Sequence, residues 1–113
     1  MKSKIVALST NQNFKNLLKE KKISNKYLTI YFGKLSNKDN KKLNIGFVVK
    51  KKLGNAVIRN KIKRRLRNIM NEAYKKIDIN LNYSYLLVAK KMIFDDKYEN
   101  VKKTLLTDFC KIK

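Results

Sequence analysis

The sequence contains no histidine, no proline and no tryptophan, and its only cysteine is Cys110. A chain without histidine has no imidazole to act as a general base, and a single cysteine leaves no ligand set for structural zinc. It also allows no internal disulfide, which favours a reducing compartment. Because no apolar run approaches about 18 residues and the first ten residues lack a signal-peptide core, we expect a cytoplasmic protein without a membrane segment.

Acidic residues are scarce as well. Eight Asp and Glu stand against 29 Lys and Arg, which gives the 113 residues a formal net charge of +21. Such an excess repels itself in a compact chain, so we expect a polyanionic partner, with nucleic acid ahead of an anionic membrane surface.

The few carboxylates are also poorly placed for chemistry. Metal-assisted cleavage of a phosphodiester needs several convergent carboxylates. Only Asp95 and Asp96 are adjacent, and helix capping explains that pair better than metal binding does. We therefore expect no catalytic residue and no metal site on the chain itself.

The length and the hydrophobic fraction of 43% predict one folded domain covering residues 1–113. Helical spacing predicts a first helix capped by Ser9 or Thr10 and ending near Lys21, a long helix over 56–77, and a last helix capped by Asp95 or Asp96. Alternation predicts strands over 27–32, 43–50 and 83–90. The order is helix, strand, strand, helix, strand, helix. It predicts an α+β sandwich in which helices pack on one mixed sheet.

All four arginines fall between residues 59 and 67, whereas the lysines run from Lys2 to Lys113. A planar guanidinium can grip a phosphate in bidentate fashion, and an ammonium cannot. At about 100° per residue, five polar residues cover an arc of roughly 140° beside the apolar stripe of the long helix. They are Arg59, Asn60, Lys63, Arg64 and Arg67. Lys61 and Arg65 fall on the other flank of the stripe.

A solvated helix face is the ordinary reading of such a run of charges. Two features count against it here. Like charges four residues apart repel each other on an exposed helix. Glu72 is the only acidic residue on the predicted helix, so little neutralises them. The pattern therefore favours a surface that binds a structured RNA.

The same segment resembles the signature of the bacterial ribonuclease P protein subunit. That family carries Arg-Asn-x-x-Lys-Arg-x-x-Arg on its long helix, after a Lys-Lys-x-Gly-Asn-Ala-Val lead-in. Residues 51–67 match every fixed position of both patterns. A match of this length is specific, and the chain length and the order of elements extend the resemblance over nearly the whole sequence.

The resemblance implies a subunit of the ribonucleoprotein endoribonuclease that removes the 5′ leader of precursor tRNA. It implies that the catalytic centre of the holoenzyme lies on the RNA and that the RNA binds most of its Mg²⁺. No obligate protein partner is evident from the sequence. The residues that would bind the catalytic RNA are Arg59, Asn60, Lys63, Arg64, Arg67, Lys51 and Lys52. A cleft between the first helix and the sheet would bind the 5′ leader. The residues that would line this cleft are Phe14, Leu18, Tyr31 and Lys90. The family also implies a left-handed β-α-β crossover, against the usual right-handed rule.

Three positions depart from the family pattern. Leu18 stands where the first helix carries a second aromatic residue, Lys21 where a glycine is usual, and Lys90 where the third strand ends in arginine. These departures change the stacking capacity and the edge of the cleft. They leave the basic helix intact.

A leader cleft also has a physical basis that is independent of the family. Unpaired nucleotides bind grooves that combine positive charge with aromatic faces, at about 1–3 kcal/mol per stacked base. The alternating face of Tyr27, Thr29 and Tyr31 offers such a surface. A plain core position is the alternative for Phe14, and Tyr27 is expected at the edge of the sheet. The alternative function is a basic ribosomal-type RNA-binding protein with no part in catalysis, and a self-sufficient nuclease comes third.

Overall fold

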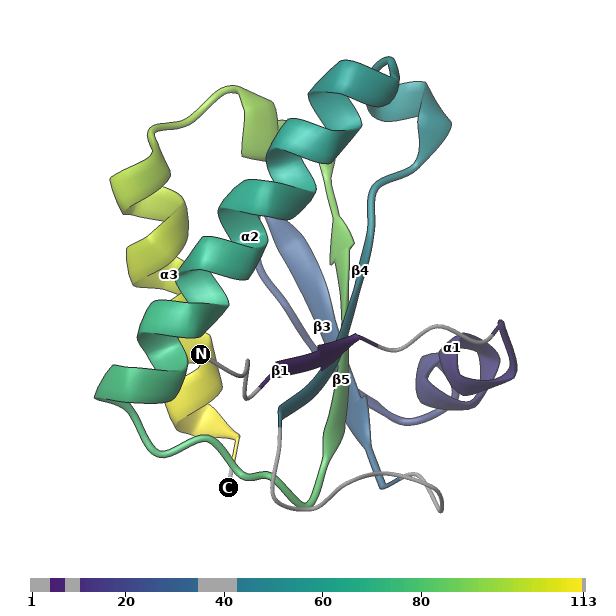
Figure 1. Ribbon diagram of the computed structural model, residues 1–113, viewed down its shortest axis with the longest axis vertical. Coiled ribbons are helices and arrows are strands. Elements are labelled where there is room, and N and C mark those ends of the chain that lie inside the picture. The colour runs from purple at the N-terminus through teal and green to yellow at the C-terminus, as the bar shows by residue number, and fades with distance from the viewer. Residues whose placement is uncertain (1–4, 8–10, 35–42, 113) are drawn as a thin grey trace.

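The computed structural model describes residues 5–7, 11–34 and 43–112, with side chains from Lys15 onward (Figure 1). Ser9 and Thr10, the expected caps of the first helix, lie outside the described residues, and so does the side chain of Phe14.

A five-stranded mixed sheet forms the middle layer, with the strand order β1-β4-β5-β3-β2. The strands are β1 (Ile5–Ala7), β2 (Lys21–Ser24), β3 (Leu28–Gly33), β4 (Leu43–Val48) and β5 (Ser84–Ala89). β4 runs parallel to both β1 and β5, whereas β3 is antiparallel to both β5 and β2.

Three helices cover the two faces of the sheet. α1 (Asn11–Leu18) lies on one face, and α2 (Ala56–Lys76) and α3 (Tyr98–Lys111) lie together on the other (Figure 1). Two short 3-10 helices, η1 (Lys51–Leu53) and η2 (Lys91–Phe94), precede α2 and α3. In Figure 1, β4 and β5 rise side by side and α2 descends to their left, with β4 nearer to the viewer. The β4–α2–β5 crossover is therefore left-handed, as the resemblance implies.

The three helices and three longer strands follow the predicted order, and β1 and β2 add an edge strand on each side. β1 has three residues, and β2 reads Lys-Lys-Ile-Ser with Ile23 as its only apolar residue, so neither shows a clear alternating pattern. Lysines on an edge strand discourage pairing with other chains. The first helix ends at Leu18 instead of near Lys21, because Lys21 already pairs with Phe32.

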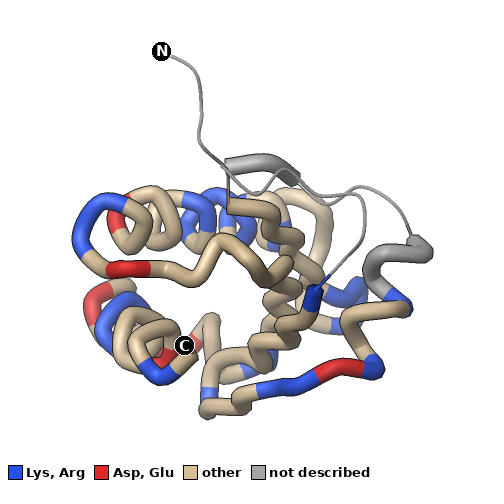
Figure 2. Tube along the Cα trace, turned by 90° about the horizontal axis from the view of Figure 1, so that it is seen from below, with Lys and Arg blue, Asp and Glu red and all other residues tan. Residues whose placement is uncertain are grey.

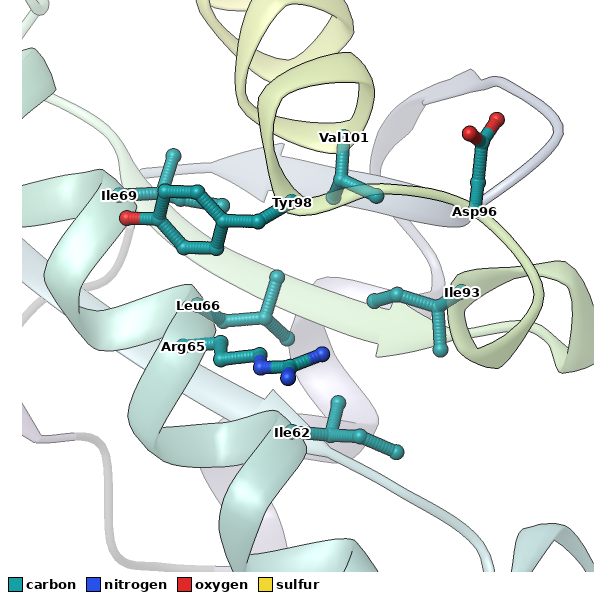
Figure 3. Close-up of a pocket in the computed structure, with 8 residues that line it drawn as sticks. All are labelled: Ile62, Arg65, Leu66, Ile69, Ile93, Asp96, Tyr98 and Val101. Atoms are coloured by element: carbon teal, nitrogen blue, oxygen red, sulfur yellow. The ribbon is translucent and has the colours of Figure 1, made fainter.

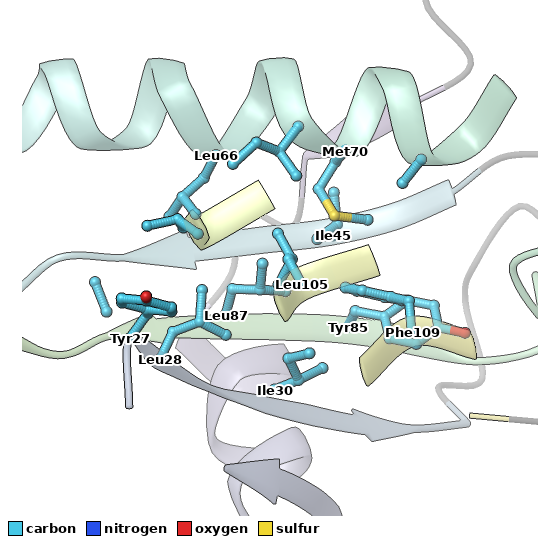
Figure 4. Packing of buried hydrophobic residues seen from close by; sticks show 14 of the residues in the cluster. Tyr27, Leu28, Ile30, Ile45, Leu66, Met70, Tyr85, Leu87, Leu105 and Phe109 are labelled. Atoms are coloured by element: carbon cyan, nitrogen blue, oxygen red, sulfur yellow. The ribbon is translucent and has the colours of Figure 1, made fainter. Parts of the chain in front are cut away.

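The hydrophobic core fills the space between the sheet and the α2–α3 layer (Figure 4). The predicted apolar stripe of the long helix is buried at Ile62, Leu66, Ile69 and Ala73, while Ile58 at its start is 39% exposed. The predicted stripe of the last helix is buried at its three inner positions, Val101, Leu105 and Phe109. On the other face, Leu17 of α1 and Leu86 of β5 are buried.

Tyr27 contradicts its predicted place at the sheet edge. It lies in the turn before β3, is 1% exposed and belongs to the core. The Asn25 side chain accepts hydrogen bonds from the backbone N–H groups of Tyr27 at 2.8 Å and Leu28 at 3.0 Å. Such an Asx-type turn interrupts the strand alternation on which the sequence argument relied, and it turns the Tyr27 ring inward.

Asp96 also differs from its predicted role as the cap of the last helix. The N-cap is Lys97, which makes no side-chain capping bond. Asp96 Oδ1 instead accepts from the Lys97 backbone N–H and from Asn100 Nδ2, both at 2.7 Å, and Oδ2 accepts from the Tyr27 hydroxyl. The carboxylate therefore ties the β2–β3 turn to the start of α3.

These hydrogen bonds make stability depend on pH. The Tyr27 hydroxyl, then Asn100, lower the pKa of Asp96 from 3.8 to about 2. Because the folded pKa lies below the unfolded one, this stabilisation is present above pH about 4 and is lost as the pH falls toward 2. We expect Asp96→Asn to unfold at lower urea than the parent at pH 7, and the gap to close near pH 2. The control is Asp95→Asn, and a gap of equal size at both pH values would contradict the assignment.

Candidate nucleic-acid interface

The basic helix starts at a defined cap. Asn55 adopts an extended conformation and its side chain accepts from the Ile58 backbone N–H at 3.0 Å, which satisfies one free donor of the first turn. A Cβ added at Gly54 would stand 3.0 Å from Cγ2 of Ile58, so glycine lets the chain pass close to the helix. The Gly-Asn of the lead-in therefore fixes where the 21-residue rod begins.

One side of this rod carries the basic flank, defined as Arg59, Asn60, Lys63, Arg64 and Arg67. Asn60, Arg64 and Arg67 are exposed, and Arg59 and Lys63 are half-buried. Because Ile62 and Leu66 anchor the opposite side in the core, the exposed side chains project away from the sheet. The basic flank has the geometry that the helical spacing predicts.

No arginine in the described part of the chain forms an ion pair. The pairs found there join lysines to acids: Lys26–Asp96, Lys76–Glu72, Lys102–Glu72 and Lys111–Asp108. The Nε of Arg59 is buried without a hydrogen-bond partner. Basic residues recur along α2, while acidic positions are few (Figure 2). The guanidiniums are therefore free to meet an external anion.

Glu72, the one acid on α2, does not neutralise the basic flank. Its carboxylate pairs with Lys102 of α3, and this contact lowers the pKa of Glu72. The pair lies where α2 and α3 meet, on the side of the helix away from Arg59, Lys63 and Arg67.

Arg65 also faces α3, as its predicted place on the other flank requires. It lines a small crevice with residues of α2, η2 and α3, and its side chain lies across the opening toward Ile93 (Figure 3). Arg65 therefore offers a charge on the same helix, similar in exposure to Arg64, but outside the basic flank.

Lys51 and Lys52 are exposed on η1, directly before the start of α2. The free N–H groups of a helix N-terminus carry a partial positive charge. The two lysines therefore extend the positive surface past the end of the rod.

The predicted leader site falls on the sheet face that carries α1. Pairing places Tyr31 beside Leu86, and Thr29 beside Val88. Leu86 is buried, but Thr29, Tyr31 and Val88 are half-buried, so a strip of the sheet beside α1 stays partly uncovered.

Lys90 lies two residues beyond Val88 and so projects from the same face. Its Nζ donates to Ser24 Oγ at 2.6 Å and to the Asn25 carbonyl at 2.7 Å. Leu18 of α1 is 49% exposed. The structure thus brings Tyr31 and Lys90 to the α1 side and excludes Tyr27 from it.

Sequence reasoning missed Asn25. Its Nδ2 donates to the buried Asp108 of α3 at 2.7 Å, while its carbonyl accepts from Lys90. This residue therefore holds the turn that fixes the ammonium of Lys90. The Ser24-Asn25 pair just before the predicted strand over 27–32 was the available turn signal.

Among the described residues, no three Asp, Glu or Cys side chains come together as a metal ligand set. Within the same ranges, no helix has the length and apolar character required to span a bilayer.

Comparison with known proteins gives a consistent answer. The family model described as Ribonuclease P matches residues 3–113. The ribonuclease P protein component of Bacillus cereus strain Q1 is 33% identical over 103 residues, which covers 90% of this chain and 86% of that protein. The solved RNase P protein of Thermotoga maritima has a TM-score of 0.78 at 26% identity, covering 96% of this chain and 98% of its own. For the Staphylococcus aureus RNase P protein the TM-score is 0.77 at 27% identity, covering 94% and 93%. The left-handed β4–α2–β5 crossover, the arginines that form no ion pair with the described residues and these matches agree, and the chain belongs to the ribonuclease P protein family.

Proposed function

We propose that this chain binds the catalytic RNA of ribonuclease P through the basic flank together with Lys51 and Lys52. The observation that carries the proposal is a row of guanidiniums on a rod anchored in the core, with no acidic partner in the described residues. From Arg59 to Arg67 the flank covers about 12 Å of the helix axis at 1.5 Å per residue. Donors held at fixed spacing can select a folded RNA backbone by its shape.

We propose that the bond cleavage and the Mg²⁺ of the holoenzyme belong to the RNA. In this proposal the chain's own contribution is electrostatic. A net charge of +21 reduces the repulsion between the catalytic RNA and the precursor tRNA. A protein with this role meets its substrate in the cytoplasm.

We further propose that the 5′ leader lies along the partly uncovered strip beside α1. Tyr31 offers a ring for an unpaired base, and Lys90 offers an ammonium at the end of the strip. Leu18 would border the strip from α1. Phe14, whose side chain lies outside the described residues, stays an expectation from the family resemblance.

Reconstitution tests the function directly. We expect precursor tRNA to be cleaved by the RNA with the protein at a Mg²⁺ concentration at which the RNA alone is slow. We expect no cleavage by the protein alone. Cleavage without the RNA would favour a nuclease, and no effect on the RNA's activity would favour the ribosomal-type reading.

The leader site makes a separate prediction. Tyr31→Leu should weaken holoenzyme binding of precursor tRNA by about 5- to 150-fold, the loss of one stacked base at 1–3 kcal/mol. Binding of mature tRNA, which lacks the leader, should not change. Tyr31→Phe keeps the ring and serves as the control, so it should bind like the parent. Equal losses for both RNAs would mean that Tyr31 only supports the fold.

A further inference from the structure

A second candidate site lies between the two short helices that precede α2 and α3. An open groove of about 560 Å³ is lined by Lys52 and Leu53 of η1, by Lys91 and Phe94 of η2, and by Asp95. Leu53 and Phe94 are half-buried and pack against the core, while Lys52, Lys91 and Asp95 are exposed. The groove therefore has an apolar, aromatic floor and a charged rim, and its size falls in the range of small-ligand sites.

The walls of this groove are held by backbone hydrogen bonds. In η1 the Leu53 N–H donates to the Lys50 carbonyl at 3.0 Å, and in η2 the Ile93 N–H donates to the Lys90 carbonyl at 3.1 Å. Ile93 is itself buried, at 7% exposure. Each wall is thus a hydrogen-bonded turn that packs on the core, through Leu53 in η1 and through Phe94 in η2.

The rim charges have no ion-pair partners among the described residues. Lys52, Lys91 and Asp95 line one groove, yet neither lysine comes within 4.0 Å of the carboxylate. The groove therefore has two ammonium groups and one carboxylate on its rim, around the Phe94 ring on its floor. Such a surface suits a ligand that carries both a negative group and hydrogen-bond donors on a flat ring.

We propose that this groove binds one unpaired guanosine nucleotide of an RNA. The base lies against the Phe94 ring, its phosphate lies between Lys52 and Lys91, and the Asp95 carboxylate accepts from the two adjacent N–H groups of the guanine edge. The inference rests on the proposed RNA-binding function and adds a contact outside the basic flank.

The carboxylate selects the base. An ionised carboxylate only accepts hydrogen bonds. Guanine presents two neighbouring donors on its Watson–Crick edge, whereas adenine, cytosine and uracil place an acceptor beside the donor. That edge and a ring face are free only in an unpaired nucleotide. Lys52 belongs to the lead-in of the basic helix, so an RNA strand bound there can reach the groove.

Titration of the ¹⁵N-labelled full chain with the trinucleotides UGU and UAU tests this site. We expect UGU to shift the backbone amides of η1 and η2 and to bind about tenfold tighter than UAU, the discrimination of one bidentate contact. Asp95→Asn should remove most of the guanine preference. Phe94→Leu keeps an apolar floor and should weaken both trinucleotides by about fivefold or more, as expected for a lost stacking partner. Asp78→Asn, an exposed carboxylate outside the groove, is the matched control and should change nothing.

Three outcomes would overturn the proposal: equal binding of UGU and UAU, a guanine preference that survives Asp95→Asn, or shifts confined to the basic flank. Free guanosine monophosphate forms another arm of the titration. If it binds as tightly as UGU, the groove is a site for a free nucleotide and the RNA assignment is wrong. If the protein prefers guanine but is inactive in reconstitution, only the proposed function is refuted. If the holoenzyme is active but the protein shows no guanine preference, only this site is refuted.

Discussion

The double variant Arg64→Ala/Arg67→Ala is expected to bind ribonuclease P RNA about 100-fold more weakly than the parent near physiological salt. Each guanidinium is exposed and forms no ion pair among the described residues, so its hydrogen bonds are available to phosphates. Hydrogen bonds of charged groups are worth about 1.5–3 kcal/mol each, so losing two of them at the lower end, about 3 kcal/mol, weakens binding by a factor of that order. Folding should change little, because exposed side chains without intrachain partners contribute about 0.5 kcal/mol or less.

Salt dependence separates a phosphate contact from a general loss of charge. Each phosphate contact removed should lower the slope of log affinity against log salt by about 0.7–0.9. Arg65→Ala is the matched control, since it removes the same charge from the same helix on the side that faces α3. It should leave the slope close to that of the parent. A slope change in Arg65→Ala as large as in Arg67→Ala would show that net charge, and not the basic flank, governs binding.

The long helix was predictable because two independent patterns agree on it. Apolar residues at steps of three and four from Ile62 to Ala73 define a buried side, and that side fixes where Arg64 and Arg67 must point. Asn55 and Gly54 mark its start through local chemistry that the sequence displays. Local periodicity therefore located the helix and its basic flank together.

The edge strands and the buried position of Tyr27 were not predictable in this way, because the contacts that fix them are distant in sequence. β2 forms since Lys21 and Ile23 pair with Phe32 and Ile30, and its own composition shows no strand pattern. Asn25 makes the turn locally, but the hydroxyl of Tyr27 is held by Asp96, which lies 69 residues away. Contacts of that kind appear only after the chain has folded.

The groove between η1 and η2 was hidden for the same reason. Lys52 and Phe94 are separated by the whole of α2 and β5. They meet because β4 and β5 are adjacent and parallel, so the chain leaves both strands at the same edge of the sheet. The sequence gives each residue a plausible local role, basic connector or apolar position. The topology of the sheet brings these residues together as the charged rim and apolar floor of one groove.

Leu66→Ala is expected to destabilise the fold strongly without removing any charge. Leu66 is 1% exposed in the core between the sheet and the helices, and it lies directly between Arg65 and Arg67 (Figure 4). Truncating a buried leucine costs about 2–5 kcal/mol, a large share of the 5–15 kcal/mol that stabilises a typical domain. At about 4–8 °C per kcal/mol for a domain of this size, thermal unfolding should show a Tm lowered by roughly 10–40 °C.

Measuring RNA binding by Leu66→Ala separates the structural role of the buried side of α2 from the binding role of the basic flank. If the buried side of α2 anchors the rod and the basic flank binds, Leu66→Ala should lose affinity only as far as it is unfolded, and saturating RNA should raise its Tm again by mass action. Leu18→Ala is the matched control, because Leu18 is 49% exposed and its truncation should cost under about 1 kcal/mol. A Leu66→Ala protein as stable as Leu18→Ala would show that the helix is not held by its apolar stripe. The fixed spacing of the guanidiniums, on which selective binding of a folded RNA depends, would then have no structural cause.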